Sequence, residues 1–124
     1  MRVIIAGSRG IDDYEFICHK LNDCERPWPI TEVVSGTARG VDRLGERWAG
    51  SKDIPIKRFP ADWDTYGKSA GYRRNADMAK YADVLIAFWD GTSKGTKHMI
   101  DLMTAAGKHT IVHDCGKEWS DDQT

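Results

Sequence analysis

The chain of 124 residues lacks any long uninterrupted hydrophobic run. Its first apolar stretch follows Met1 and Arg2 and ends at Gly7 after about five residues, which is too short for a signal-peptide core or a membrane helix. The sequence therefore predicts neither export nor a membrane partner. We expect a cytoplasmic protein.

The chain also has few cysteines and almost no net charge. The three cysteines, Cys18, Cys24 and Cys115, are odd in number and show no CxxC spacing, which argues against a disulfide framework and a structural zinc site. His109 and His113 lie four residues apart without a supporting cluster of ligands, so we expect no metal. Lys and Arg number 18 against 19 Asp and Glu. This balance does not favour a nucleic-acid partner, which would need a local basic patch.

Two common nucleotide-binding fingerprints are missing. The glycine loop at residues 7–10 reads GxxG rather than GxGxxG, and Ser35-Gly36 ends the second apolar run without a carboxylate for a ribose hydroxyl. The glycines within residues 91–97 do not have the spacing of a P-loop. These departures argue against a nicotinamide dehydrogenase and a P-loop NTPase, and we expect no cofactor.

Short β-branched runs, by contrast, recur with starts about 25 to 30 residues apart, the length of a strand and a crossover helix. Apolar residues at helical spacing lie between them, within 14–21, 41–48, 78–82 and 99–103. The sequence predicts an α/β fold: a Rossmann-like doubly wound sheet of five parallel strands in the order 3-2-1-4-5, with helices on both faces. The five runs are 3–5, 33–34, 54–56, 84–86 and 110–112.

We expect one domain over residues 1–115 and a polar tail over residues 116–124, in which only Trp119 looks able to dock. Within the domain, ligands should bind outside the carboxyl ends of the strands where the winding reverses, here between strands 1 and 4. The loops at that edge are rich in glycine, which lets the backbone approach an anion beside the N–H groups of a helix. A phosphate-bearing ligand is therefore predicted, although glycines can also simply end strands. The candidate ligand-binding residues are Gly7, Ser8, Arg9, Gly36, Thr37, Arg39, Gly40, Asp42, Asp90, Gly91, Thr92, Ser93, Gly95 and Thr96.

Charged residues refine this hypothesis. Arg9 and Arg39 stand inside glycine loops, where a guanidinium group can form paired hydrogen bonds to phosphate, and Arg74 is the next candidate. Asp42 is either a ligand contact or a first-turn carboxylate that stabilises its helix. Glu46, one turn further along, could bind ribose hydroxyls, act as a general base or form a surface ion pair.

Aromatic residues suggest where a base could stack. The spacing of Trp48 predicts a core position, whereas Trp89 could pack or stack. Residues 62–71 lack periodicity and contain Gly67, Ser69 and Gly71, so we predict a loop that could close over a ligand as a lid. The aromatic residues in and beside it are Trp63, Tyr66 and Tyr72.

Two segments resemble a known superfamily. Residues 35–42, SGTARGVD, resemble the SGxARGxD segment of DNA-processing protein A, and residues 91–96 resemble the GGxGT loop of LOG-type phosphoribohydrolases. Both belong to the SLOG superfamily. With Arg74-Asn75 and the ADVLI segment at 82–86, the resemblance extends from Arg2 to about Val112 and is strongest to small YspA/YpsA-related SLOG proteins of bacteria and phages. It implies a Rossmann-like fold and a nucleotide or nucleotide-derived ligand.

The chain departs from the LOG hydrolases at one catalytic position. Arg74 matches their catalytic arginine, but Met99 stands where they have a catalytic glutamate. Asp101 follows about 200° further around the predicted helix and should point away. The candidates for catalysis are therefore Arg74, Glu46 and Asp42.

Three functions remain open. The first is binding of a nucleotide or an ADP-ribose-like derivative in order to sense, sequester or process it. The second is an N-glycosidase that acts on nucleoside monophosphates, and the third is a DNA-binding module like DNA-processing protein A. The resemblance also implies a homo-oligomer, a dimer or larger, for which the apolar helix at residues 99–106 could supply a face.

Overall fold

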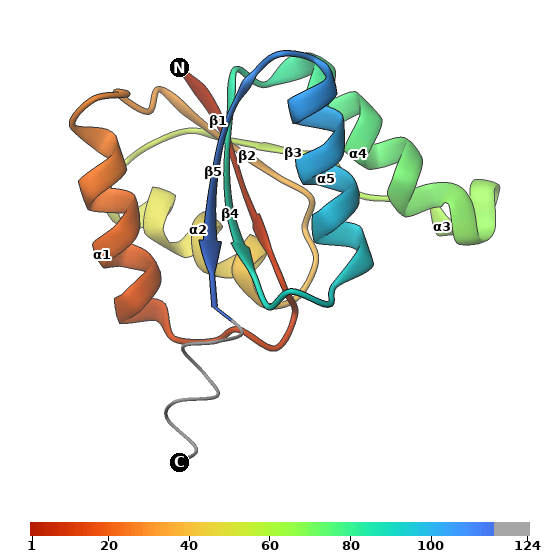
Figure 1. Ribbon diagram of the computed structural model, residues 1–124, viewed down its shortest axis with the longest axis horizontal. Helices are drawn as coiled ribbons and strands as arrows, with labels where there is room; N and C mark the ends of the chain where they lie inside the picture. The colour runs from red at the N-terminus through yellow and green to blue at the C-terminus, as the bar shows by residue number, and fades with distance from the viewer. Residues whose placement is uncertain (116–124) are drawn as a thin grey trace.

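The computed structural model describes residues 1–115, so the predicted tail and Trp119 lie outside the described residues. Strands and helices alternate along the chain (Figure 1). In order, they are β1 (Arg2–Gly7), α1 (Tyr14–Glu25), β2 (Glu32–Ser35), α2 (Val41–Ser51), β3 (Ile56–Arg58), α3 (Trp63–Tyr66), the 3₁₀ turn η1 (Gly67–Ser69), α4 (Ala70–Tyr81), β4 (Val84–Trp89), α5 (Lys94–Ala105) and β5 (His109–Asp114).

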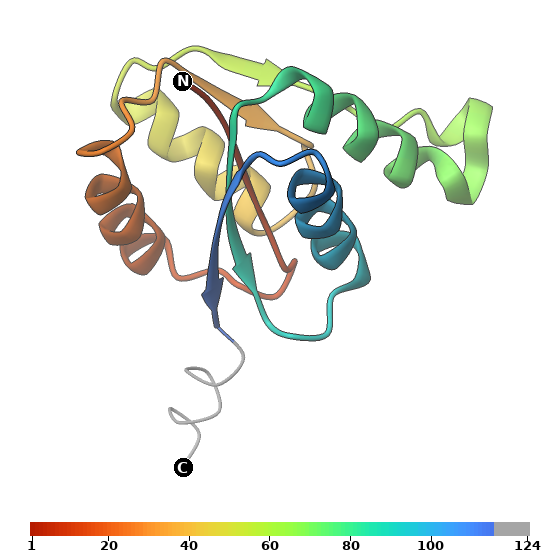
Figure 2. The same ribbon diagram turned by 45° about the horizontal axis from the view of Figure 1, so that its top comes forward.

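The five strands form one parallel sheet in the order β3-β2-β1-β4-β5, which confirms the predicted topology. Because successive strand residues point to opposite faces, β1 supplies both halves of the core. Val3 and Ile5 pack with α1 and α2, whereas Ile4 packs with α4 and α5. The two pairs of helices therefore cover opposite faces of the sheet (Figures 1 and 2).

Local signals account for most element boundaries. Asp13 caps α1 by accepting a hydrogen bond from the Phe16 N–H at 3.2 Å. Trp48 is in the core, as predicted, and its indole N–H donates to Asn22 Oδ1 at 3.1 Å. The third strand begins at Ile56, two residues later than predicted, because the Ile54 N–H bonds the Ala49 carbonyl and the intervening proline has no N–H.

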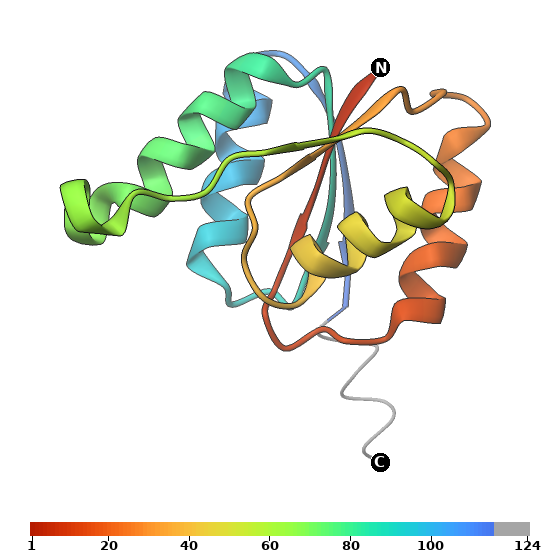
Figure 3. The same ribbon diagram turned by 180° about the vertical axis from the view of Figure 1, so that it is seen from behind.

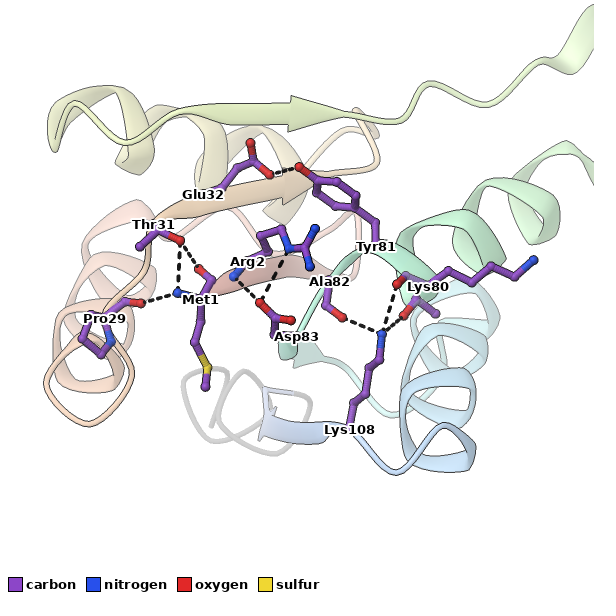
Figure 4. Close-up of polar contacts among 11 residues, drawn as sticks. Met1, Arg2, Pro29, Thr31, Glu32, Lys80, Tyr81, Ala82, Asp83 and Lys108 are labelled. Atoms are coloured by element: carbon purple, nitrogen blue, oxygen red, sulfur yellow. Dashed lines mark hydrogen bonds and ion pairs between the residues drawn. The ribbon is translucent and has the colours of Figure 1, made fainter.

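The amino ends of the strands are tied together by polar contacts (Figure 4). The Arg2 N–H donates to the Asp83 carboxylate at 2.8 Å, and the Tyr81 hydroxyl donates to Glu32. Lys108, which precedes β5, donates its ammonium protons to three backbone carbonyls at the C-terminal end of α4. These contacts join β1, β2, α4 and the start of β5 at the edge opposite the glycine loops.

The segment from α3 to the start of α4 projects from the body of the molecule as an arm (Figures 1 and 3). The prediction of an irregular loop at residues 62–71 was wrong, because Asp62 caps a helical turn by accepting from the Thr65 N–H at 3.1 Å and η1 leads directly into α4. The arm exposes three large rings. Their exposed fractions are 53% for Trp63, 46% for Tyr66 and 50% for Tyr72.

The helix at residues 99–106 does not offer the apolar face suggested for an oligomer. Met99 and Met103 are buried in the core, and Ile100 and Leu102 pack against the same cluster. The basis for placing a subunit contact on this helix is therefore lost, although an oligomer stays a prediction. Within residues 1–115, no helix has the length and apolar character needed to cross a membrane.

Candidate functional site

The three glycine loops meet at the carboxyl ends of the strands. The Ser8 hydroxyl accepts a hydrogen bond from the Asp90 N–H at 3.0 Å, which joins the loop after β1 to the loop after β4. Gly40 has a φ of 79°, and a β-carbon there would lie 2.7 Å from the Arg9 carbonyl oxygen. A glycine is therefore needed where the loop after β2 crosses the loop after β1.

These loops enclose an inner pocket of about 100 Å³. Its lining combines apolar side chains with one carboxyl group, two guanidinium groups and residues from the N-terminal end of α5. The lining residues are Ala6, Gly7, Arg9, Gly36, Ala38, Asp42, Arg74, Asn75, Met78, Ser93, Gly95, Thr96 and Met99. The lining contains no aromatic ring.

Asp42 is the carboxyl group of the inner pocket. Its side chain is buried, and Oδ2 accepts a hydrogen bond from the Ala38 N–H at 3.1 Å. Burial raises the pKa of Asp42 from 3.8 to about 6, although the bond from Ala38 and the charge of Arg74 oppose this rise. The group therefore changes its charge close to neutral pH.

Arg74 lies beside Asp42 and is held by two acceptors. One of its terminal N–H groups donates to the Gly36 carbonyl, and Nε donates to Asn75 Oδ1 at 3.0 Å. A β-carbon on Gly36 would lie 2.8 Å from Arg74 Nη1 and 2.9 Å from Asp42 Oδ2. Gly36 is thus the residue that allows these two charged groups to close on the loop. Burial lowers the pKa of Arg74 from its usual value, but the guanidinium remains a cation.

The N-terminal end of α5 presents backbone donors to the same pocket. Ser93 caps the helix through a hydrogen bond from the Thr96 N–H, and Asp90 Oδ1 accepts from the N–H groups of Thr92 and Ser93, each at 2.8 Å. The N–H groups of Lys94 and Gly95 bond no acceptor within residues 1–115. Free N–H groups and the helix dipole favour an anion at this position.

Asp90 supports the loop electrostatically. Burial alone would raise its pKa, but the hydrogen bonds from Thr92, Ser93 and Ser8 together hold the pKa below its usual value. Asp90 is consequently ionised over the whole neutral range and keeps the loop before α5 folded.

An outer pocket of about 240 Å³ opens beside the inner one. Four residues line both pockets: Arg9, Arg74, Asn75 and Gly95. The remaining lining comes from the arm and the first turn of α4, with Trp63, Lys68, Gly71 and Tyr72. The two pockets therefore form one cleft with a cationic junction between them.

The candidate residues divide into two groups. Those that line the cleft are Gly7, Arg9, Gly36, Asp42, Arg74, Ser93, Gly95 and Thr96. Those that line neither pocket are Ser8, Thr37, Arg39, Gly40, Glu46, Asp90, Gly91 and Thr92. Several of the second group build the loops rather than face the cleft, as Ser8, Gly40 and Asp90 do.

Both carboxylate oxygens of Glu46 are bonded to other side chains of the protein, which does not suit a general base. Its Oε2 accepts from the Ser35 hydroxyl at 2.6 Å, and its Oε1 accepts from Arg58 Nε at 2.9 Å. The structure thus contains the ion pair that was one of the alternatives. Trp89 likewise holds a loop, because its indole N–H donates to the Ser93 carbonyl at 3.0 Å.

Asn75 was not among the candidates, although it lines both pockets. Its side chain is buried, donates to the Gly95 carbonyl at 3.3 Å and lies 3.1 Å from His98 Nδ1. Its spacing from Met78 and Ala82 puts a polar residue on the apolar stripe of α4, which is the signal that could have identified it.

Possible metal ligands are dispersed. The ring of His109 packs on Trp28 with centroids 4.3 Å apart, and that of His113 stacks on Phe88 at 5.0 Å. In the part of the chain that the structure describes, no group of three or more His, Cys, Asp or Glu side chains could hold a metal ion.

Fold and site together define a Rossmann-like α/β protein with its cleft at the point where the winding of the sheet reverses. The model of the YspA, cpYpsA-related SLOG family matches residues 1–66, and the chain belongs to this family. Membership supports a nucleotide-related binding or processing role. The chain is also similar to the Gene 61 protein of Mycobacterium phage D29, with 39% identity over 114 residues, which are 86% of this chain and 90% of that protein. No solved structure matches the chain.

Proposed function

We propose that the protein binds a nucleotide or an ADP-ribose-like derivative and holds its phosphate at the junction of the two pockets. The observation that carries this proposal is the position of Arg9. It is exposed, lines both pockets and has no ion-pair partner within residues 1–115. A guanidinium group without a carboxylate partner is free to bind an anion.

Arg74 and α5 complete the proposed phosphate site. The free N–H groups of Lys94 and Gly95 supply directed donors, and Arg74 supplies a second cation. Sensing, sequestering and processing of the ligand are all compatible with this arrangement.

Asp42 is the proposed contact for a sugar. Its Oδ2 is used by the Ala38 N–H, whereas Oδ1 bonds no donor within the described residues. A ribose hydroxyl could donate to Oδ1, and this bond would compensate for the burial of the carboxyl group.

A second candidate function, N-glycosidic hydrolysis, is favoured by the pKa of Asp42. A buried carboxyl group with a pKa of about 6 beside a cation is suited to proton transfer near neutral pH. Met99, however, lines the inner pocket and can neither activate water nor stabilise a developing positive charge. Binding is therefore the main proposal.

The test is isothermal titration calorimetry with ADP-ribose and AMP. Binding by the wild-type protein is expected, and Arg9→Ala should weaken it by about 1.5 to 3 kcal/mol, the scale of a charged hydrogen bond. Arg26→Ala is the matched control because it removes the same charge from an exposed position just after α1, at the opposite edge. Failure of the wild-type protein to bind either compound, or equal affinities of the two variants, would contradict the proposal.

A further inference from the structure

We infer that the outer pocket is a base-stacking subsite and that the ligand is a nucleoside diphosphate sugar. This inference rests on the proposed function and extends it. The sequence of chemical groups along the cleft matches such a ligand: aromatic rings outside, cations at the junction and a carboxyl group inside.

The aromatic residues distinguish the two pockets. Trp63 and Tyr72 both line the outer pocket although each ring is about half exposed to solvent. The inner pocket is less than half as large and has no ring in its lining. A nucleobase gains most from stacking on aromatic faces, so it belongs in the outer pocket.

The indole ring of Trp63 lies close to the start of α4. A β-carbon on Gly71 would lie 3.4 Å from Trp63 Cη2 and 3.8 Å from Arg74 Nη2. One point of the α4 backbone thus brings the indole ring and the phosphate-binding guanidinium close together. Any larger residue at position 71 would occupy the space between them.

Tyr72 is held by a ring contact with α5. Its ring meets the ring of His98 edge-on, with centroids 4.6 Å apart and planes at 88°. His98 is in turn fixed by the Asn75 side chain at 3.1 Å, which also bonds the carbonyl of Gly95. The ring is therefore anchored to α5 beside the proposed phosphate site.

The charges of the outer pocket indicate more than one phosphate group. Arg9, Lys68 and Arg74 contribute three cations to its lining, and no carboxylate of residues 1–115 lines it. Only Asp42, in the inner pocket, offsets this charge. A diphosphate between a base and a sugar would place its charges at the junction, with the second sugar next to Asp42.

The experiment compares three ligands by calorimetry: ADP-ribose; AMP, which lacks the second phosphate and the second sugar; and ribose 5-phosphate, which lacks the whole adenosine and one phosphate. We expect the wild-type protein to bind ADP-ribose most tightly. Trp63→Ala should weaken binding of ADP-ribose about 5-fold to 150-fold, the range measured for base stacking, and Trp63→Phe should retain most of the affinity. Binding of ribose 5-phosphate should be the same in all variants.

Tyr66→Ala is the matched control. Tyr66 is an equally exposed ring of the same arm, but it packs under Arg73 at 4.3 Å and does not line the outer pocket. Its loss should leave all three affinities unchanged. Tyr72→Ala provides a second test of the subsite, and circular dichroism should verify that each variant is folded.

The outcomes separate the two proposals. If ADP-ribose and ribose 5-phosphate bind the wild-type protein equally, phosphate binding stands and the base subsite is overturned. Equal binding of AMP and ADP-ribose would overturn the diphosphate sugar assignment. If no ligand binds, the proposed function fails as well. A short oligothymidylate that displaces ADP-ribose and depends on Trp63 would instead assign the arm to single-stranded DNA.

Discussion

Asp42 combines a structural role with an unfavourable charge. Its carboxyl group accepts the Ala38 N–H and thereby shapes the loop after β2. The same burial that allows this bond disfavours the ionised form, which is why the pKa rises to about 6. Shifted pKa values concentrate at functional sites, and the position of Asp42 in the inner pocket agrees with that tendency.

The stability of the protein should depend on Asp42 and on pH. Below about pH 4 the group is protonated in both the folded and the unfolded chain. As the pH rises toward 6, the unfolded chain releases its proton first, because its pKa stays near 3.8. Taken by itself, the titration of Asp42 should therefore lower the free energy of unfolding by about 3 kcal/mol across this range, whereas the lowered pKa values of Asp83 and Asp90 act in the opposite direction.

Urea denaturation of Asp42→Asn at several pH values tests this prediction. The substitution removes the titrating group, so its free energy of unfolding should decline less between about pH 4 and pH 7 than that of the wild-type protein. The exposed Asp12 provides the control, since Asp12→Asn should keep the wild-type pH profile. Parallel profiles for wild type and Asp42→Asn would be inconsistent with a raised pKa.

The sequence and the structure lead to different expectations for the role of Arg39 in phosphate binding. Its place in a glycine loop predicted phosphate binding, and Arg39→Ala would then weaken binding of ADP-ribose by about 1.5 to 3 kcal/mol. Arg39 is exposed and lines neither pocket, unlike Arg9. Calorimetry on the two alanine variants should therefore show the larger loss for Arg9. A larger loss for Arg39 would return this residue to the phosphate site.

At the level of single residues, the sequence predicted which residue types form the site better than it predicted which side chains point into the cleft. Arg9, Asp42 and Arg74 were candidates from their motifs and do line the cleft. Arg39 does not, because the loop around it contains positive φ angles of 64° at Thr37 and 79° at Gly40. A pattern of residue types does not specify such angles, and they determine where a side chain points.

At the level of elements, periodicity predicted the sheet order and the helices, whereas the arm was missed. Four residues suffice for α3, and its helical turn depends on the Asp62 cap rather than on a repeating apolar pattern. A helix that buries no residue leaves no hydrophobic signal in the sequence. The arm and the start of α4 nevertheless supply half of the residues that line the outer pocket.

Lys108 should stabilise the junction between α4 and β5. Its ammonium group donates to the carbonyls of Ala79 at 2.6 Å and Ala82 at 2.7 Å, where the helix dipole is negative (Figure 4). Lys108→Met keeps the aliphatic chain and removes these bonds. We expect a loss of about 1 to 2 kcal/mol in the free energy of unfolding, measured by urea denaturation.

A suitable comparison is Lys97→Met. Lys97 and Asp101, both on α5, form an exposed ion pair at 2.8 Å. Pairs of this kind contribute about 0.3 to 0.5 kcal/mol, so this variant should be nearly as stable as the wild-type protein. Equal losses in the two variants would show that Lys108 acts only as a surface charge.

The two edges of the sheet have different roles in the whole molecule. At the amino edge, side chains bond one another and the ends of elements, as between Arg2 and Asp83. At the carboxyl edge, the N–H groups of Lys94 and Gly95 bond no acceptor within residues 1–115, and Arg9 forms no ion pair there, although its charge acts on Asp42. Both edges are thus bonded internally, but donors without acceptors gather at the carboxyl edge, where open parallel sheets bind their ligands.

The balance between binding and catalysis is the last property of the whole molecule that can be tested. Cleavage of an N-glycosidic bond needs a carboxylate near the anomeric carbon and an activated water. Met99 lines the inner pocket at the corresponding position, and Asp101 is exposed and paired with Lys97. Glu46 is paired with Arg58, so among residues 1–115 Asp42 is the one carboxyl group that lines the cleft.

We therefore expect the protein to bind nucleoside phosphates but to release little or no free base. Incubation with AMP and ADP-ribose, followed by chromatography of the products, measures this release directly. Any slow turnover should disappear in Asp42→Asn, because no other carboxyl group of the described residues lines the cleft. Glu46→Gln should leave that turnover unchanged, since Glu46 lines neither pocket. Repeated turnover that survives both substitutions would show that the cleft catalyses hydrolysis without a carboxylate, and binding could then no longer be its main role.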